Sequence, residues 1–302
     1  MREYLLVFLL AAAVTYLLTV LAREVALRLG AVAGVRDRDV HDEPVPYLGG
    51  VAMYGGIVAA VLVAHQLPFL SRSYDFVFTD AFHVLIAGAV ICAVGVVDDI
   101  IELDALSKLG GQVIAAGLLV WFGIQYNFFY LPDGRVISEN SQAAALSVFA
   151  VLATANAVNF VDGLDGLAAG VVGIGATAFL MFCYQIANLN QLPLATTGAL
   201  LSAALAGACA GFILHNFHPA RIFMGDSGSM LLGLMLTASA MTLTGQFNPA
   251  DLQRDAATSQ PWLIFLMPVL VPVAILIVPL LDLTLSVLRR TLRGQPFFHP
   301  DK

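Results

Sequence analysis

Charge is what this sequence has least of. Only 12% of its 302 residues are Asp, Glu, Lys or Arg, against ~25% in a typical soluble domain. Hydrophobic residues make up 59% of the chain, and its mean hydropathy is +0.86. No stretch remains that could form a soluble domain of any size, so the composition favours a polytopic membrane protein.

Basic residues and paired cysteines are also scarce. The 14 Lys and Arg residues are scattered and the formal net charge is −7, which excludes a basic surface that follows a nucleic-acid backbone. Cys92, Cys183 and Cys209 each lie inside an apolar run, and none has a CxxC spacing. Neither a zinc site nor a disulfide framework is indicated.

Long apolar runs are what the chain does have, and a membrane helix needs about 20 such residues. The last run carries Pro268, Pro272 and Pro279, which predicts a kinked or broken helix. The predicted fold is therefore an all-α polytopic membrane protein with about nine spans. These are 4–22, 47–66, 82–98, 107–124, 143–160, 165–187, 194–214, 228–246 and 261–288.

Lys and Arg residues in the loops predict the orientation, because cytosolic loops carry an excess of them. With the N-terminus outside, ten of the 14 fall on the cytosolic side and four on the outer side. The loops that carry polar clusters then share the cytosolic side, which predicts a single catalytic face there. These loops are 23–46, 98–107, 156–165, 215–227 and 289–302.

The segment 156–168 places amides and carboxylates at a turn between two apolar runs. Asn156, Asn159, Asp162 and Asp165 lie there beside two glycines. Carboxylates at a membrane edge are expensive, and by default they indicate a functional site. The alternative is an ordinary helix-capping turn, where Asn, Asp and Gly are common.

Adjacent aspartates, Asp98 and Asp99, directly follow another apolar run. They repel each other, and the dipole at a helix C-terminus disfavours negative charge. A compensating cation is therefore expected, whether Lys108, a divalent metal or both. The alternative is a solvent-exposed acidic loop.

Two glycine-containing loops complete the pattern. In the first, Pro44 and Pro46 stiffen the chain before Gly49 and Gly50, where a backbone can approach a ligand closely. A lone histidine such as His41 is more often a surface residue than a catalyst. In the second, 225–228 reads Gly-Asp-Ser-Gly. Its Asp226 or Ser227 is expected to cap a helix that starts near Met230, with free N–H groups that bind phosphate.

This set of residue types suits phosphoryl transfer, which needs mainly positioning and charge neutralisation. Magnesium prefers one or two carboxylates together with substrate phosphates. Asp226 with Asn159 is expected to hold Mg²⁺, with Mn²⁺ as the alternative ion. Lys108 and an arginine among 289–293 would neutralise phosphate. Without a soluble domain, one substrate is expected to be a lipid phosphate.

Four segments together resemble the polyprenyl-phosphate N-acetylhexosamine-1-phosphate transferases of bacterial envelope synthesis, in glycosyltransferase family 4. Their order and spacing match across nearly the whole chain. The Pro-x-Pro-x-x-Gly-Gly form and the ending at 296–302 look like the branch that uses UDP-N-acetylglucosamine. The four segments are 41–50, 97–108, 156–170 and 216–233.

The resemblance implies transfer of a sugar 1-phosphate, most closely GlcNAc-1-phosphate, from a UDP-sugar to undecaprenyl or decaprenyl phosphate, with release of UMP. It places the reaction at the bacterial plasma membrane, where it starts the synthesis of an envelope glycan, and it allows a homodimer. It also implies residue roles. Asp98 and Asp99 would be catalytic, with Asp98 as general base; Asp226 and Asn159 would hold the metal; His41, Lys108, Asn156, Asn159, Asp162, Asp165 and Asn216 would bind substrate.

Two departures from the family pattern affect these expectations. Tyr47 stands where an Arg is common, and the chain ends at Lys302, before a His-x-His-His motif and one or two further helices. The expectation is a single integral-membrane transferase domain over 1–302, truncated at its C-terminus and either weakly active or inactive. The sequence leaves open UDP-MurNAc-pentapeptide as donor, a cation-coupled transporter and a catalytically inactive scaffold.

Overall fold

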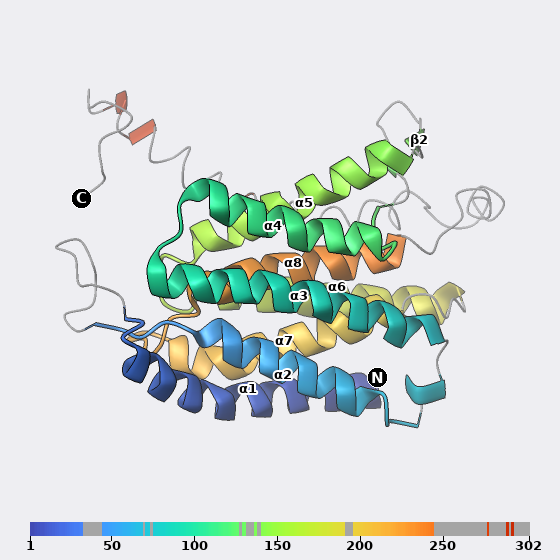
Figure 1. The fold of residues 1–302 in the computed structure, drawn as a ribbon. Coiled ribbons are helices and arrows are strands. Elements are labelled where there is room, and N and C mark those ends of the chain that lie inside the picture. The colour runs from blue at the N-terminus through green and yellow to red at the C-terminus, as the bar shows by residue number, and fades with distance from the viewer. Residues whose placement is uncertain are drawn as a thin grey trace.

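The computed structural model describes residues 1–32, 44–68, 70–72, 75–126, 129–130, 136–137, 140–190 and 196–244, with positions 277, 288–289 and 291–292. Eight α-helices run through these ranges (Figure 1). They are α1 (Arg2–Leu29), α2 (Gly49–Ala64), α3 (Asp75–Ile101), α4 (Ala105–Trp121), α5 (Asn140–Val161), α6 (Leu167–Asn190), α7 (Thr196–Asn216) and α8 (Gly225–Thr244).

Apart from these helices, the described residues form one 3-10 turn, η1 (Leu70–Arg72), and one pair of two-residue strands. The strands β1 (Phe129–Tyr130) and β2 (Val136–Ile137) are antiparallel. The all-α prediction is confirmed, and the first eight predicted spans each coincide with one helix. Most of the ninth, 261–288 with its three prolines, lies outside the described residues.

Turn residues set the helix ends as local chemistry requires. Gly30 follows α1 with φ 73°, and its N–H donates to the Ala26 carbonyl, because glycine adopts the left-handed conformation without strain. Asp104 precedes α4, and its carboxylate accepts from the Leu106 and Ser107 amides. The same carboxylate also accepts from the Ser107 hydroxyl. This bond, followed by the bonds from the amides, holds the pKa of Asp104 below its usual value.

Helix α8 lies at the centre of the bundle. It packs against α2, α3, α5 and α7, and its side chains from Met230 to Leu243 are almost completely buried. Helices α1 and α6 lie on either side of α7, and α4 packs outside α3 and α5. In Figure 1, α8 accordingly runs between the other helices. The residues at its first turn therefore meet side chains from several neighbours.

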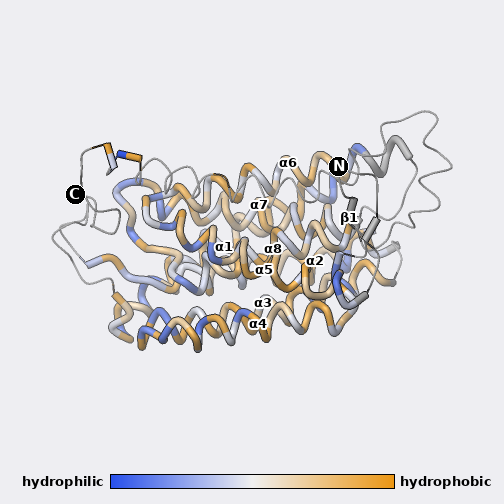
Figure 2. Tube along the Cα trace, turned by 90° about the horizontal axis from the view of Figure 1, so that it is seen from above, coloured by the Kyte–Doolittle hydropathy of each residue, from blue (hydrophilic) through white to orange (hydrophobic). Residues whose placement is uncertain are grey.

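The composition of the bundle is that of a multi-pass membrane protein. Five described helices, α1, α3, α5, α6 and α7, are long and apolar enough to cross a membrane, while α2 and α4 are shorter apolar helices. Apolar residues predominate along the middle of the bundle, and hydrophilic segments gather mainly near its ends (Figure 2). The predicted number of spans and the predicted orientation remain predictions.

Glycine in α3 lets that helix approach the start of α8. A Cβ at Gly95 would lie 2.4 Å from the Ser227 Cα and backbone N. The Gly95→Ala variant must displace α8, so we expect it to lose about 2 kcal/mol of folding stability, as overpacked cores do. The thermal midpoint in detergent measures this loss. Gly117→Ala on α4 is the control, because no atom lies within 4 Å of its Cβ position. Equal midpoints for both variants would contradict the close approach.

Candidate active site

The loops that carry the predicted site residues meet at one end of the bundle, opposite the N-terminus (Figure 1). They are the turns 102–104, 162–166 and 217–224 and the segment that enters α2. Backbone hydrogen bonds join the last two: the Phe223 N–H donates to the Pro46 carbonyl at 2.9 Å, and the Gly49 N–H donates to the Phe223 carbonyl at 3.1 Å. The predicted convergence of these loops on one face is thus found in the fold.

Lys108 is the cation between two carboxylates. Its Nζ lies 2.9 Å from Asp98 Oδ2 and also pairs with Asp226 Oδ2. Asp98 is only 8% exposed, and its Oδ1 accepts from the Leu103 amide at 2.7 Å. The expectation that Lys108 compensates the acidic pair is confirmed for Asp98. The alternative of an exposed acidic loop is wrong for this carboxylate, since the short α3–α4 turn folds Lys108 back over it.

Asp226 is held from a third helix as well. The Asn159 amide of α5 donates to Asp226 Oδ1 and, at 2.9 Å, to the buried Ser229 hydroxyl. The Asn159 side chain therefore lies against Asp226, as expected for two residues that share one task. Reasoning from the sequence missed Ser229, although its place three residues after Asp226, on the same helix face, was a usable signal.

Asp99 points away from its neighbour. Its Oδ1 accepts from the Asp226 amide at 2.7 Å, and its Oδ2 accepts from the Ser227 amide at 3.2 Å. Helix α8 consequently begins at Gly225, and the prediction of a start near Met230 was wrong. The expectation of free N–H groups at this helix end is wrong for the Asp226 and Ser227 amides, because both donate to the Asp99 carboxylate of α3.

Asp165 and Asn216 tie loops together. Asp165 Oδ2 lies 2.9 Å from His218 Nδ1 and accepts from the Ala220 amide at 3.0 Å. The buried Asn216 accepts from the Gly166 amide and donates to the Ile222 carbonyl, each at 3.0 Å. The turns after α5 and α7 are thereby locked to one another. The predicted contact of both residues with substrate remains a prediction.

Asn156 lies one turn before Asn159 on α5 and faces α4. Its Nδ2 donates to Gln112 Oε1 and to the Leu152 carbonyl, each at 2.7 Å. Gln112 is buried and also contacts the Met230 sulfur. Sequence reasoning missed Gln112, although a lone amide one turn after Lys108 in an apolar run was a usable signal.

The two remaining predictions at this end concern the first loop. His41 lies outside the described residues. The expectation that Gly50 lets the backbone approach a ligand was wrong, because a Cβ there would lie 2.1 Å from the backbone N of Gly228. The glycine serves the packing of α2 against α8.

Asp162 follows α5, and its carboxylate accepts no hydrogen bond from the described part of the chain. Burial raises its pKa well above the usual value, and the carboxylates of Asp226, Asp99 and Asp165 raise it further. An ionised group with a raised folded-state pKa costs stability once the pH exceeds its unfolded value of ~3.9. Above that pH, Asp162 therefore lowers the folding stability of the protein.

The Asp162→Asn variant removes that cost. We expect its thermal midpoint in detergent to exceed that of the wild type at about pH 8, with a difference that shrinks as the pH falls towards ~3.9. A difference that does not change with pH, or one of opposite sign, would contradict the raised pKa.

The donor set fits a divalent cation that is completed by substrate. Among the described residues, no three His, Cys, Asp or Glu side chains form a metal-binding group. Asp98 and Asp226 nevertheless share a single ammonium, that of Lys108, so negative charge is in excess. Mg²⁺ takes one or two carboxylates together with phosphate oxygens, and Asp226 with Asn159 offers such a partial set.

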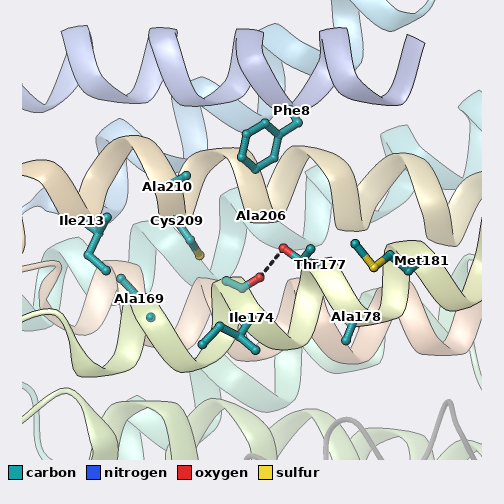
Figure 3. Close-up of a pocket in the computed structure, with 12 residues that line it drawn as sticks. Phe8, Ala169, Ile174, Thr177, Ala178, Met181, Ala206, Cys209, Ala210 and Ile213 are labelled. Carbon is teal, nitrogen blue, oxygen red and sulfur yellow. Dashed lines mark hydrogen bonds between the residues drawn. The ribbon is translucent and has the colours of Figure 1, made fainter. Parts of the chain in front are cut away.

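A cavity of about 520 Å³ lies elsewhere, between α1, α6 and α7 (Figure 3). Its lining includes Phe8, Ile174, Met181 and Ile213, and none of the residues around Lys108. The hydroxyl of Thr177 is satisfied by the Gly173 carbonyl at 2.8 Å. With no charged group in its lining, this cavity does not suit phosphate chemistry.

Comparison with known sequences gives one matching family. The profile described as glycosyl transferase family 4 matches residues 81–244. This range covers most of α3 and all of α4 to α8, and hence Asp98, Lys108, Asn159 and Asp226.

Curated relatives match beyond this range. The decaprenyl-phosphate N-acetylglucosaminephosphotransferase of Mycobacterium tuberculosis is 46% identical over 306 residues, covering 100% of this chain and 74% of the relative. The probable undecaprenyl-phosphate N-acetylglucosaminyl 1-phosphate transferase of Bacillus subtilis is 30% identical, with 100% and 76% covered. The phospho-N-acetylmuramoyl-pentapeptide-transferase of Desulforudis audaxviator is 34% identical over 261 residues, with 77% and 75% covered.

Proposed function

The chain belongs to glycosyl transferase family 4, and from this premise we propose that it transfers GlcNAc-1-phosphate from UDP-GlcNAc to a polyprenyl phosphate. An oxygen of the lipid phosphate forms a bond to the β-phosphorus of the nucleotide sugar. The bond between that phosphorus and the bridging oxygen breaks, and UMP leaves. The product is a polyprenyl-diphosphate-GlcNAc.

One observation carries the proposal: Lys108 lies between Asp98 and Asp226, with Asn159 on the far side of Asp226. Four helix ends thus bring one cation, two carboxylates and an amide to a single point. Phosphoryl transfer needs positioned charges of this kind and little covalent chemistry from the protein.

GlcNAc is favoured over MurNAc-pentapeptide as the sugar by the relatives. Those named for N-acetylglucosamine match the whole chain, at up to 46% identity. The pentapeptide transferase matches only 77% of it. What these relatives are named for is a property of those proteins, and it supports the same donor for this chain.

The residues around Lys108 have different roles in the proposed reaction. The Lys108 ammonium neutralises a phosphate oxygen and keeps Asp98 and Asp226 close together. Asp98 faces the incoming lipid phosphate, where it orients the attacking oxygen or takes up its proton. Asp226 and Asn159 would hold Mg²⁺, which supplies positive charge to the diphosphate when it is bound.

The end of the bundle that carries Asp98, Lys108 and Asp226 would face the cytosol at the bacterial plasma membrane, because UDP-sugars are made in the cytosol. The excess of Lys and Arg in the loops on this side supports that orientation. The prediction of a homodimer is independent of this geometry and stays a prediction.

The test of the reaction is UMP release by purified protein in detergent with polyprenyl phosphate, Mg²⁺ and a panel of UDP-sugars. Release with UDP-GlcNAc, and not with UDP-MurNAc-pentapeptide, would support reaction and donor together. Release only with the pentapeptide donor would overturn the donor. Activity that depends on an ion gradient and not on any UDP-sugar would favour a transporter.

The role of Asp98 makes a separate prediction. Asp98→Asn keeps the shape of the side chain but lowers its charge. We therefore expect kcat to fall about 100-fold, as for loss of a general base, while KM for UDP-GlcNAc stays within about 2-fold. Steady-state kinetics of UMP release, with each substrate varied in turn, measures both. A rise in this KM at constant kcat would contradict the assignment to the lipid phosphate.

A further inference from the structure

The first turn of α8 is capped from another helix. The first amides of a helix lack partners within it and need outside acceptors. Met224, the residue before α8, has no side-chain oxygen to supply one. Asp99 of α3 does so instead, with one carboxylate oxygen on the Asp226 amide and the other on the Ser227 amide.

The contact leaves no room for another side chain. Gly225 has φ 70°, and a Cβ on it would lie 2.5 Å from both carboxylate oxygens of Asp99. Gly95 lies on α3, as Asp99 does, and a Cβ on it would meet the backbone of Ser227. The two glycines thus allow the carboxylate to reach the helix end, and the geometry requires them both.

The capped residue is the one that the proposed chemistry depends on. Asp99 holds the backbone of Asp226, whose own side chain reaches Lys108 and Asn159. The two oxygens of Asp99 are engaged with amides, whereas Asp98 faces Lys108. The adjacent aspartates therefore meet different partners.

We propose that Asp99 is a positioning residue that fixes the direction of the Asp226 carboxylate by capping α8, and that it contacts neither the metal nor a substrate. This inference rests on the proposed function and adds to it a division of labour within the aspartate pair. An ionised carboxylate is the suitable cap, because it accepts both amides and its charge complements the positive end of the helix. An asparagine would present an N–H₂ group to one of them.

The Asp99→Asn variant tests the inference. We expect kcat to fall about 10- to 100-fold, as for groups that orient a metal ligand. Mn²⁺ affinity, measured by electron paramagnetic resonance on the enzyme with UDP-GlcNAc, should weaken to a similar degree. Binding of UDP-GlcNAc without metal should stay within about 2-fold. The control is Glu102→Gln, which removes one charge from the same end of α3 without touching these amides, and should change none of the three.

The rate of amide hydrogen exchange at the start of α8 tests the cap and requires no catalytic activity. Peptides that cover the start of α8 should exchange faster in Asp99→Asn than in the wild type, while peptides from α6 and the rest of α8 should not change. This readout separates the two claims, because it holds even for an enzyme that turns over no UDP-sugar. Unchanged exchange at Asp226 and Ser227 would overturn the cap.

A second variant approaches the same contact from the other side. Gly225→Ala keeps both aspartates but pushes Asp99 away, so it should reproduce the loss of kcat and of Mn²⁺ affinity. In the double variant Asp99→Asn/Gly225→Ala, the losses should not multiply, because both changes break one contact. Multiplied losses, or a Gly225→Ala enzyme with wild-type kcat and Mn²⁺ affinity, would overturn the positioning role. If Asp99→Asn does not fold, Gly225→Ala alone decides.

Discussion

Replacing Asp226 with asparagine should abolish nearly all activity while leaving the fold intact. Its carboxylate is the one that Lys108 and Asn159 share, and the proposed account makes it a ligand of Mg²⁺. Charge stabilisation by a bound metal is worth several kcal/mol, and each ~1.4 kcal/mol is a factor of ten in rate. We therefore expect kcat to fall about 100- to 1,000-fold.

The rate of UMP release, measured over a range of Mg²⁺ concentrations, checks this expectation. The matched control is Asp104→Asn at the same end of the bundle, which keeps a good helix cap because Asn and Asp are equivalent there. Both variants should unfold at a midpoint close to that of the wild type. If Asp226→Asn works at a near wild-type rate when Mg²⁺ is limiting, Asp226 is not a metal ligand.

Lys108→Met is the second change with a large expected effect, and it should damage stability as well as activity. The Lys108 side chain is 20% exposed, and the side chains of Asp98 and Asp226, whose carboxylates it neutralises, are 9% and 25% exposed. Removing one member of a buried ionic group leaves unpaired charge behind, at a cost of about 3 kcal/mol. Turnover should fall at least about 100-fold, because a phosphate contact is lost with the charge.

Thermal unfolding in detergent and UMP release measure the two effects separately. Arg28→Met is the control, since Arg28 pairs with Glu24 in an exposed position on α1, where ion pairs contribute little. Adding Asp98→Asn to Lys108→Met should restore part of the stability, because one unpaired charge is removed, but none of the activity. Stability that does not change in Lys108→Met would contradict the neutralising role.

Much of this arrangement could be predicted from the sequence, because hydrophobic length specifies membrane helices directly. The eight helices follow from eight apolar runs. Asp98 and Lys108 flank the turn between α3 and α4, and Asp226 follows the turn between α7 and α8. The four helices between these two turns, α4 to α7, are an even number, so the chain returns to the same end of the bundle. Polar residues at the ends of apolar runs therefore predicted which side chains meet at this end of the bundle.

What the sequence does not reveal is which partner each polar residue takes. Asp98 and Asp99 are adjacent, so composition treats them alike, yet successive residues on a helix point about 100° apart. One faces Lys108 and the other faces the amides of α8. The same holds for Gly50, since a glycine that permits close approach does not say whether a ligand or another helix approaches.

The start of helix α8 could not be predicted from the local sequence either. The start of α8 at Gly225 depends on a carboxylate supplied by Asp99, 126 positions earlier in the numbering, and no local pattern records such a cap. Asp165 and Asn216 likewise bond across loops that are far apart in the chain. Local sequence thus places these residues at the site but leaves their contacts to the tertiary fold.

The most direct test of the account follows the fate of one phosphorus atom. UDP-GlcNAc labelled with ³²P in its β-phosphate is incubated with polyprenyl phosphate, Mg²⁺ and the purified protein, and the label is located after extraction into organic solvent. The account predicts that the β-phosphorus travels with the sugar, so that the lipid is labelled and the released UMP is not. Label that remains in UDP beside an unlabelled glycolipid would mean glycosyl transfer without phosphate, and would contradict the central claim.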